Sequence, residues 1–292
     1  MSPDTPRPAP ETTLPPLREV IARHGLSARR SLGQHFLLDL NLTRRIARSA
    51  GPLGGCTVVE IGPGPGGLTR ALLETAARKV VVIERDPRCR LALEQLGTTY
   101  SGRLVIVEAD ALRCDPVAVA GANGPCAIVA NLPYNIGTRL LLGWLRNLSG
   151  ITSMTLMFQK EVAERIVAAP GTASYGRLSV ITQWLCEARA LFDISPRAFV
   201  PPPKVISTVV KLASRPEPLA PASFADLEAV TAAAFGQRRK MLRSALRSLG
   251  GDPAAMLETA NIRSDRRAET LSIEEFCTLA RARAARRETV AQ

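Results

Sequence analysis

The tetrapeptide Asn131-Leu132-Pro133-Tyr134 places an amide, a proline-fixed backbone and an aromatic ring within four residues. An amide can hydrogen-bond the edge of a planar nitrogen base, and an aromatic ring can stack on its face. The apolar run 127–130 before it is typical of a buried strand that ends at Asn131. Ligands of open α/β sheets bind beyond such strand ends. The tetrapeptide therefore predicts a nucleobase pocket or, more simply, a turn at a strand-terminating proline.

A glycine-rich turn lies between the strand expected at 57–61 and the helix that follows it. The turn holds Gly62 and Gly64, and glycines here let a ligand approach the backbone closely at a helix N-terminus. Glu84 ends the next expected strand, 22 residues after Gly62. A carboxylate at this spacing can accept hydrogen bonds from both ribose hydroxyls of an adenosine-containing cofactor. The arrangement suits NAD and S-adenosylmethionine alike.

Two features favour S-adenosylmethionine over a dinucleotide. Pro63 and Pro65 remove two backbone N–H donors that a pyrophosphate would use. Asp110 follows the strand expected at 104–107, where its carboxylate could accept from the adenine amino group of the cofactor. The simpler alternatives are a solvated charge at a strand end for Glu84 and an ordinary turn residue for Asp110.

Apolar runs bounded by Gly and Pro alternate with helical segments through the first two thirds of the chain. This alternation predicts an α/β domain with a mostly parallel, doubly wound sheet. The expected strands are 57–61, 79–83, 104–107, 127–130, 153–158 and 205–212.

The chain is expected to divide into three parts. Residues 1–16 contain six prolines and no periodic apolar pattern, which predicts a disordered extension. Residues 17–212 carry the α/β pattern and are expected to form the catalytic domain. Residues 213–292 begin with a Pro-containing linker and then show only helical periodicity, which predicts a small all-helical domain that binds RNA.

The composition is that of a globular protein with a strong positive charge. The 38 Lys and Arg outnumber the 26 Asp and Glu, for a net charge of +12. Nucleic acid is the natural partner, although an Arg-rich chain can also reflect genome base composition. Six scattered cysteines without a Cys-x-x-Cys pair predict no metal site. With no signal peptide and no stretch of about eighteen apolar residues, we expect a cytoplasmic protein without a membrane span.

Residues 237–247 hold five cations and no acid, and they are expected to form one basic helix. Met241 and Leu242 would lie on its packed side, and arginines at four-residue spacing would form a stripe along another side. The stripe could bind RNA phosphates, or it could be a solvated helix face. The candidate RNA-binding residues are Arg238, Arg239, Lys240, Arg243 and Arg247.

Seven motifs together resemble those of the ribosomal RNA adenine N6,N6-dimethyltransferase family, of the KsgA type, across most of residues 30 to 250. They are SLGQHFL at 31–37, VEIGPG at 59–64, NLPYNI at 131–136, QKEV at 159–162, YGRLS at 175–179, FVPPPKV at 199–205 and QRRK at 237–240. The resemblance implies a Rossmann-like class I S-adenosylmethionine-dependent methyltransferase domain. It also implies methylation of two adjacent adenosines near the 3′ end of small-subunit rRNA, late in subunit assembly. We expect a monomer that binds the small ribosomal subunit.

The resemblance further implies roles for individual residues. Cofactor contacts fall to Gln34, His35, Leu37, Gly62, Gly64, Glu84, Asp110 and Asn131. The target adenine would lie among Asn131, Leu132, Pro133, Tyr134 and Phe199. We expect the ring of Tyr134, and not its hydroxyl, to hold the base by stacking.

Two positions depart from the family pattern. His35 stands where the family usually has Asn, and Ile206 stands where an acidic or small polar residue is common.

Three other functions compete with this one. They are a non-catalytic RNA-binding or transcription factor on a methyltransferase fold, a resistance-type methyltransferase of large-subunit rRNA, and a nicotinamide oxidoreductase. The glycine turn, Glu84 and the intact Asn-Leu-Pro-Tyr segment speak against the first, and the prolines of the turn speak against the last.

Overall fold

The computed structural model describes residues 14–29, 33–100, 102–121 and 124–291, with side chains up to residue 287. Most of the predicted N-terminal extension lies outside the described residues. The chain forms two compact units. The sheet unit comprises the residues up to Ala163 together with Arg189–Ser214, and the helical unit comprises Glu164–Ala188 together with the residues from Arg215 onward. The segment Glu164–Ala188, which the sequence had placed with the α/β part, thus belongs to the helical unit.

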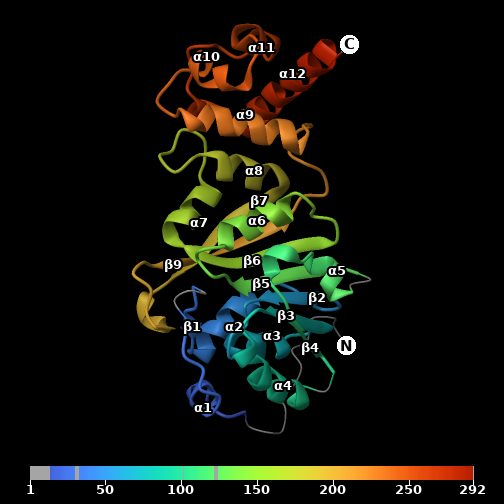
Figure 1. Ribbon diagram of the computed structural model, residues 1–292, viewed down its shortest axis with the longest axis vertical. Coiled ribbons are helices and arrows are strands. Elements are labelled where there is room, and N and C mark those ends of the chain that lie inside the picture. The colour runs from blue at the N-terminus through green and yellow to red at the C-terminus, as the bar shows by residue number, and fades with distance from the viewer. Residues whose placement is uncertain (1–13, 30–32, 101, 122–123, 292) are drawn as a thin grey trace. The chain divides into compact units, whose positions relative to one another are not determined.

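A seven-stranded sheet forms the centre of the sheet unit (Figure 1). Five neighbouring strands, from β4 (Leu104–Glu108) to β6 (Ile151–Gln159), pair in parallel. The next strand, β9 (Ser207–Ser214), pairs antiparallel with β6. The predicted mostly parallel sheet is therefore confirmed. In spatial order the strands are β4 (Leu104–Glu108), β3 (Lys79–Glu84), β2 (Thr57–Ile61), β5 (Cys126–Asn131), β6 (Ile151–Gln159), β9 (Ser207–Ser214) and β7 (Cys186–Ile194).

The sequence analysis did not predict strand β7. Its residues include Ala, Glu, Leu and Arg, which favour helices, and only its terminal residues Cys186 and Ile194 are buried. It lies at the edge of the sheet, so half-buried alternation does not mark it. Pairing with β9, which begins 13 residues after β7 ends, outweighs the local preference.

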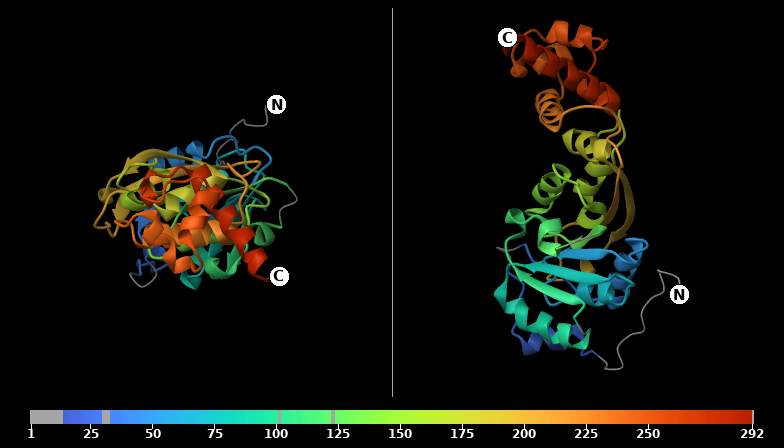
Figure 2. Two further views of the ribbon diagram at one scale, coloured as in Figure 1. Left: turned by 90° about the horizontal axis from the view of Figure 1, so that it is seen from above. Right: turned by 90° about the vertical axis from the view of Figure 1, so that its right-hand side faces the viewer.

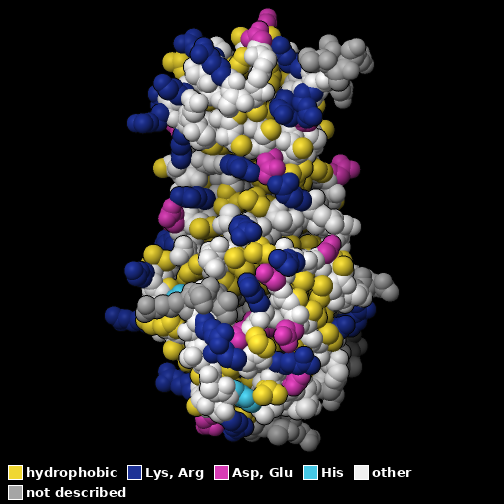
Figure 3. Space-filling view, viewed as in Figure 1, with side chains coloured by type: hydrophobic (Ala, Val, Ile, Leu, Met, Phe, Trp, Pro, Cys, Tyr) yellow, Lys and Arg dark blue, Asp and Glu magenta, His cyan; other side chains and the backbone are white. Residues whose placement is uncertain are grey.

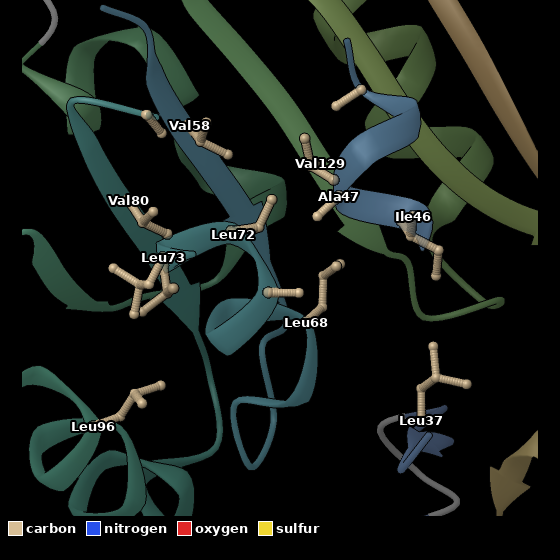
Figure 4. Close-up of a cluster of buried hydrophobic side chains, with 14 of the residues drawn as sticks. Leu37, Ile46, Ala47, Val58, Leu68, Leu72, Leu73, Val80, Leu96 and Val129 are labelled. Carbon is tan, nitrogen blue, oxygen red and sulfur yellow. The ribbon is translucent and has the colours of Figure 1, made fainter. Parts of the chain in front are cut away.

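Helices pack on the sheet and bury a continuous apolar core. One cluster joins α2, α3 and α4 to alternate residues of the strands, such as Val80 and Val82 of β3. Figure 4 shows side chains from both layers pointing toward one another, Leu68, Leu72 and Val129 among them. The helices that begin in this unit are α1 (Leu17–Arg23), α2 (Leu40–Ser49), α3 (Gly67–Leu73), α4 (Arg90–Thr99), α5 (Pro116–Ala120), α6 (Gly137–Leu145) and α7 (Lys160–Val167), with the 3-10 turns η2 (Pro87–Cys89), η3 (Ala111–Arg113) and η4 (Pro196–Ala198).

A second, two-stranded sheet joins segments far apart in the sequence. Strands β1 (Phe36–Leu37) and β8 (Phe199–Val200) pair antiparallel, with Leu37 opposite Phe199. This short pairing brings the predicted cofactor segment around Gln34 beside the predicted base-stacking residue Phe199.

The helical unit is built around α9 and α12, which pack against each other (Figure 2). Leu227 and Val230 of α9 and Phe276 of α12 are fully buried, as their helical spacing predicted. No described helix of the chain has the length and apolarity needed to cross a membrane. The elements of this unit are α8 (Arg177–Leu185), α9 (Phe224–Gly236), α10 (Leu242–Ala245), η5 (Leu246–Leu249), α11 (Pro253–Thr259), η6 (Ala268–Thr270) and α12 (Ile273–Ala291).

The prediction of one basic helix over residues 237–247 is wrong. Residues 237–240 form turns, Met241 has an extended conformation, and α10 begins only at Leu242. Met241 pairs with Arg267 in an isolated antiparallel bridge, and the Leu242 N–H donates to the Arg266 carbonyl. These tertiary backbone bonds replace the helical ones. Met241 is exposed, whereas Leu242 is buried as predicted.

The core predicts a measurable difference between two leucines. Leu72 of α3 is fully buried, whereas Leu91 of α4 is 61% exposed. We expect Leu72→Ala to lower the free energy of unfolding by about 2–5 kcal/mol, because it leaves a cavity in the core. Leu91→Ala should change it by no more than about 0.5 kcal/mol. Chemical denaturation of both variants checks this, and equal effects would contradict the packing described.

Candidate active site

One cavity lies at the carboxyl ends of β2, β3, β4 and β5, where the sequence predicted a ligand. Its lining includes every predicted cofactor residue. Phe199 is not among the lining residues, but its buried ring lies against that of His35. The predicted residues that line the cavity are Gln34, His35, Leu37, Gly62, Gly64, Glu84, Asp110, Asn131, Leu132, Pro133 and Tyr134.

The glycine turn directs its backbone N–H groups into the protein. The N–H of Gly62 donates to the Ile83 carbonyl at 2.9 Å, and that of Gly64 donates to Glu84 Oε2 at 3.0 Å. Gly64 has φ +55°, and a Cβ built on it would lie 3.1 Å from the Phe36 ring, so glycine is needed here. Pro63 and Pro65 have no N–H. The turn thus offers a pyrophosphate few donors, which fits a cationic adenosine cofactor better than a dinucleotide.

Glu84 is held by the backbone around it. Its Oε2 accepts from Gly64, and its Oε1 accepts from the N–H groups of Arg85 and Asp86, both at 2.8 Å. Burial raises the pKa of this carboxyl, and the three N–H donors oppose that rise. A carboxylate has about four acceptor sites, so Glu84 can still accept from a ribose hydroxyl in the cavity.

Asp110 follows β4, the strand that pairs with β3 beside Glu84, and it also lines the cavity. Its Oδ1 caps η3 by accepting from the Leu112 N–H at 3.0 Å, and its Oδ2 lies 3.4 Å from Nη1 of Arg85. The simpler interpretation of Asp110 as a turn residue therefore applies to its Oδ1, which caps η3. The carboxylate nevertheless lines the cavity and can accept a further hydrogen bond.

Asp86, which the sequence analysis did not assign to the site, positions the predicted cofactor residue Gln34. The side chain of Asp86 is fully buried and accepts from Gln34 Nε2 at 3.3 Å. Hydrogen bonds from the Arg88 guanidinium to the same carboxylate hold its pKa below the usual value. Arg88 also donates to the Ser27 carbonyl, so the network fastens the segment before β1 to the end of β3.

The side chain of Asn131 is oriented by His35. Its Nδ2 donates to the His35 backbone carbonyl at 3.1 Å. A carbonyl can only accept, so the amide nitrogen must face His35, and the amide oxygen is left for a donor in the cavity. The structure thus presents Asn131 as a hydrogen-bond acceptor at the end of β5.

Three aromatic rings gather next to this acceptor. The His35 ring stacks on Tyr134, with centroids 5.4 Å apart and planes at 28°, and meets Phe199 edge-on at 6.5 Å. Its Nδ1 lies 2.7 Å from the Pro201 carbonyl, so Nδ1 carries a hydrogen. The rings of Tyr134 and Phe199, which the sequence predicted as stacking surfaces, are therefore brought together through His35.

Glu60 is a buried carboxyl of the cavity wall that the sequence analysis did not assign. It precedes the glycine turn on β2 and is 2% exposed. Burial raises its pKa to about 8, although a 2.7 Å hydrogen bond from Thr69 Oγ1 opposes the rise. Its position at the end of the strand before the turn was the available signal. A cation in the cavity would favour its ionised form.

The predicted RNA-binding residues lie together in the helical unit but not on one helix. Arg239, Lys240, Arg243 and Arg247 are exposed. Arg238 is half-buried, and it forms an ion pair with Glu269 at 3.0 Å and a hydrogen bond to the Thr172 carbonyl. On the face shown in Figure 3, Lys and Arg side chains lie at the α10 end of this unit with few acidic side chains among them. A basic surface is therefore present.

The sequence as a whole is similar to that of one family of RNA-modifying enzymes. A model of the family described as ribosomal RNA adenine dimethylase matches residues 25–284. A ribosomal RNA small subunit methyltransferase A of Chelativorans sp. is 62% identical over 271 residues, which are 92% of this chain and 98% of the relative. A protein of the same name from Rhodospirillum rubrum is 60% identical over 273 residues, which are 94% of each chain.

Two solved structures share the fold over most of the chain. A dimethyladenosine transferase from Plasmodium falciparum has a TM-score of 0.73 and 25% identity, covering 84% of this chain and 96% of that one. The 23S rRNA methyltransferase ErmE has a TM-score of 0.63 and 29% identity, covering 85% of this chain and 99% of that one. The predicted Rossmann-like methyltransferase fold with a helical C-terminal part is confirmed.

The buried carboxyl of Glu60 predicts a pH-dependent contribution to stability. Its pKa is about 8 in the folded chain and 4.5 ordinarily, so between these values the folded state alone holds the proton. Its contribution to stability is complete below the unfolded pKa and is lost as the pH rises toward about 8. Glu60→Gln should remove this pH-dependent loss of stability. We therefore expect the melting temperature of the variant minus that of the wild type to grow between about pH 5 and about pH 8. A difference independent of pH would contradict the assignment.

Proposed function

Because the chain belongs to the ribosomal RNA adenine dimethylase family, we propose that it dimethylates the N6 amino groups of two adjacent adenosines near the 3′ end of small-subunit rRNA. Its methyl donor is S-adenosylmethionine, and its substrate is rRNA. The names of the relatives about 60% identical support the small ribosomal subunit as partner. We further propose that the chain acts as a monomer in the cytoplasm, late in subunit assembly.

The cavity supplies the groups that would hold the cofactor. Glu84 would accept from a ribose hydroxyl, Asp110 would accept from the adenine amino group, and Gln34, fixed by Asp86, would close the wall formed by the segment before β1. S-adenosylmethionine, when bound, supplies an electrophilic methyl group on a positively charged sulfur. The carboxyls of the cavity wall, Glu60 and Glu84, favour such a cation.

The observation that carries the proposal is the hydrogen bond from Asn131 to the His35 carbonyl. An adenine amino nitrogen is a poor nucleophile because its lone pair is delocalised into the ring. The Asn131 side-chain oxygen and the Leu132 carbonyl would accept hydrogen bonds from the two N–H groups of this nitrogen. These bonds would favour a tetrahedral nitrogen with a localised lone pair. The same preorganised acceptors stabilise the positive charge that develops on nitrogen during transfer.

Stacking would hold the extruded adenine at these acceptors. Tyr134 would provide the aromatic surface in the cavity, with Phe199 behind it through the His35 ring, and stacking on it would offset an unstacking cost of roughly a few kcal/mol. Each transfer replaces one N–H of the amino group with N–CH3, and the proton passes to solvent. Positioning supplies most of the acceleration, so the mechanism needs no strong general base.

The competing functions receive less support. The relatives named for the small subunit are about twice as similar in sequence as the 23S rRNA methyltransferase ErmE. A non-catalytic factor has no use for the oriented Asn131 amide. The inward-turned N–H groups of the glycine turn disfavour a nicotinamide dinucleotide.

Removing the Asn131 amide tests the acceptor assignment. We expect Asn131→Ala to lower methyl incorporation into immature small subunits by about a hundredfold or more, because a preorganised acceptor is lost. Calorimetric affinity for S-adenosylhomocysteine should fall by no more than about tenfold, or about 1.4 kcal/mol, because Asn131 is only one of the cofactor contacts and the others remain. Asn147→Ala is the matched control, since Asn147 is exposed beyond the other end of α6 and does not line the cavity. Near-normal turnover of Asn131→Ala would contradict the proposal.

The exposed cations of the helical unit would bind rRNA phosphates. Arg243 and Arg247 are exposed on successive turns of α10 and η5, beside the buried Leu242 and Leu246 that fix this segment to the unit. Arg239 and Lys240 precede them. Arg238 supports the surface from within through its ion pair with Glu269. Electrostatic contacts of this kind favour structured RNA without reading its sequence.

Salt dependence of subunit binding tests this surface. We expect Arg243→Ala and Arg247→Ala each to weaken binding and to reduce the slope of log affinity against log salt concentration by about 1, because each removes one phosphate contact. Arg90→Ala is the control, since Arg90 is exposed on α4 and forms an ion pair with Glu94. Equal slopes for all three variants would show that α10 does not bind the RNA.

A further inference from the structure

The hydroxyl of Tyr134 has a partner that the sequence did not suggest. Tyr134 Oη and Ser207 Oγ share a short hydrogen bond of 2.5 Å. Burial raises the pKa of Tyr134, so the phenol is neutral and free to donate. The expectation that only the ring of Tyr134 matters is therefore incomplete, because the hydroxyl fixes where the ring lies.

Ser207 itself is rigidly placed. It is fully buried as the first residue of β9 and pairs with Gln159 at the end of β6. On one side the Ile206 carbonyl accepts from the Lys160 N–H at 2.9 Å, and on the other the Thr208 hydroxyl donates to Asp193 at 2.7 Å. The hydroxyl of Ser207 is thus a fixed point on the central sheet.

The Tyr134 ring is restrained at two places. Ser207 holds its hydroxyl end, and the His35 ring lies against its face at 5.4 Å between centroids. His35 is held in turn by the Pro201 carbonyl at its ring and by the Asn131 side-chain amide, which donates to its backbone carbonyl. The bond at the hydroxyl end restrains rotation about χ1 and so fixes where the ring lies, and the His35 ring against its face restrains the plane offered to a stacked base.

We propose that Ser207 is a positioning residue for the methyl transfer, which holds the ring of Tyr134 in place beside His35 so that the stacked adenine presents its amino group to Asn131. The inference rests on the proposed function, because it assumes that Tyr134 stacks on the target base. Ser207 touches neither adenine nor cofactor. Its contribution is preorganisation, which lowers the entropy lost when the base is bound in a reactive orientation.

The experiment compares hydroxyl deletions at both ends of the hydrogen bond. Ser207→Ala, Tyr134→Phe and the double variant are assayed for kcat/KM with immature subunits, for S-adenosylhomocysteine affinity and for melting temperature. The matched control is Ser214→Ala at the far end of β9, which removes a hydroxyl bonded to the Ile151 carbonyl at 2.7 Å. The ring deletion Tyr134→Ala is measured beside them.

We expect both single variants to lower kcat/KM for subunits by about fivefold to tenfold, the equivalent of one hydrogen bond, with cofactor affinity unchanged. The double variant should be no worse than either single variant, because both remove the same bond. Ser214→Ala should leave kcat/KM unchanged even if it lowers the melting temperature.

Three outcomes would overturn the inference. The first is wild-type kcat/KM in Ser207→Ala together with a loss of activity in Tyr134→Ala. That result would leave the acceptor site intact and Ser207 without a role in it. Losses that multiply in the double variant would mean that the two hydroxyls act separately. Wild-type kcat/KM in Tyr134→Ala would overturn the acceptor site itself, and the inference with it.

Discussion

The hydrogen bond between the Asn131 amide and the His35 carbonyl is the interaction on which the site depends. It joins the end of a central strand to the segment before β1, and these two elements carry the acceptor and part of the cofactor wall. The pairing of β1 with β8 then brings Phe199 to the same place. The His35 carbonyl thus sets the orientation of the amide, and the neighbouring strand pair sets the closeness of the aromatic rings.

The parts of the site that the sequence predicted share one property, which is that local signals mark them. Asn131 ends an apolar run, Gly62 and Gly64 occupy a strand-to-helix turn, and Glu84 ends the following strand. Parallel strands bring their carboxyl ends to one edge, so these positions converge once the sheet is inferred. The structure places all of them in one cavity.

What the sequence could not predict depends on partners distant in the chain. Asp86 gains its role from Gln34 and Arg88, and Ser207 gains its role from Tyr134, through side-chain geometry that no spacing encodes. The edge strand β7 has a helical composition. The basic segment after α9 has helical spacing, but a backbone bridge between Met241 and Arg267 breaks the helix. In each case tertiary hydrogen bonds outweigh local preference.

The inward-turned glycine turn has a consequence for selectivity among nucleotides. ATP shares the adenosine group that Glu84 and Asp110 are placed to accept, but it carries a triphosphate where the methyl donor carries a cation. At the turn that triphosphate would find the N–H groups of Gly62 and Gly64 already bonded, the second of them to the Glu84 carboxyl. The turn therefore disfavours the commonest adenosine compound of a cell by leaving its phosphates few hydrogen-bond donors, without having to exclude it by size.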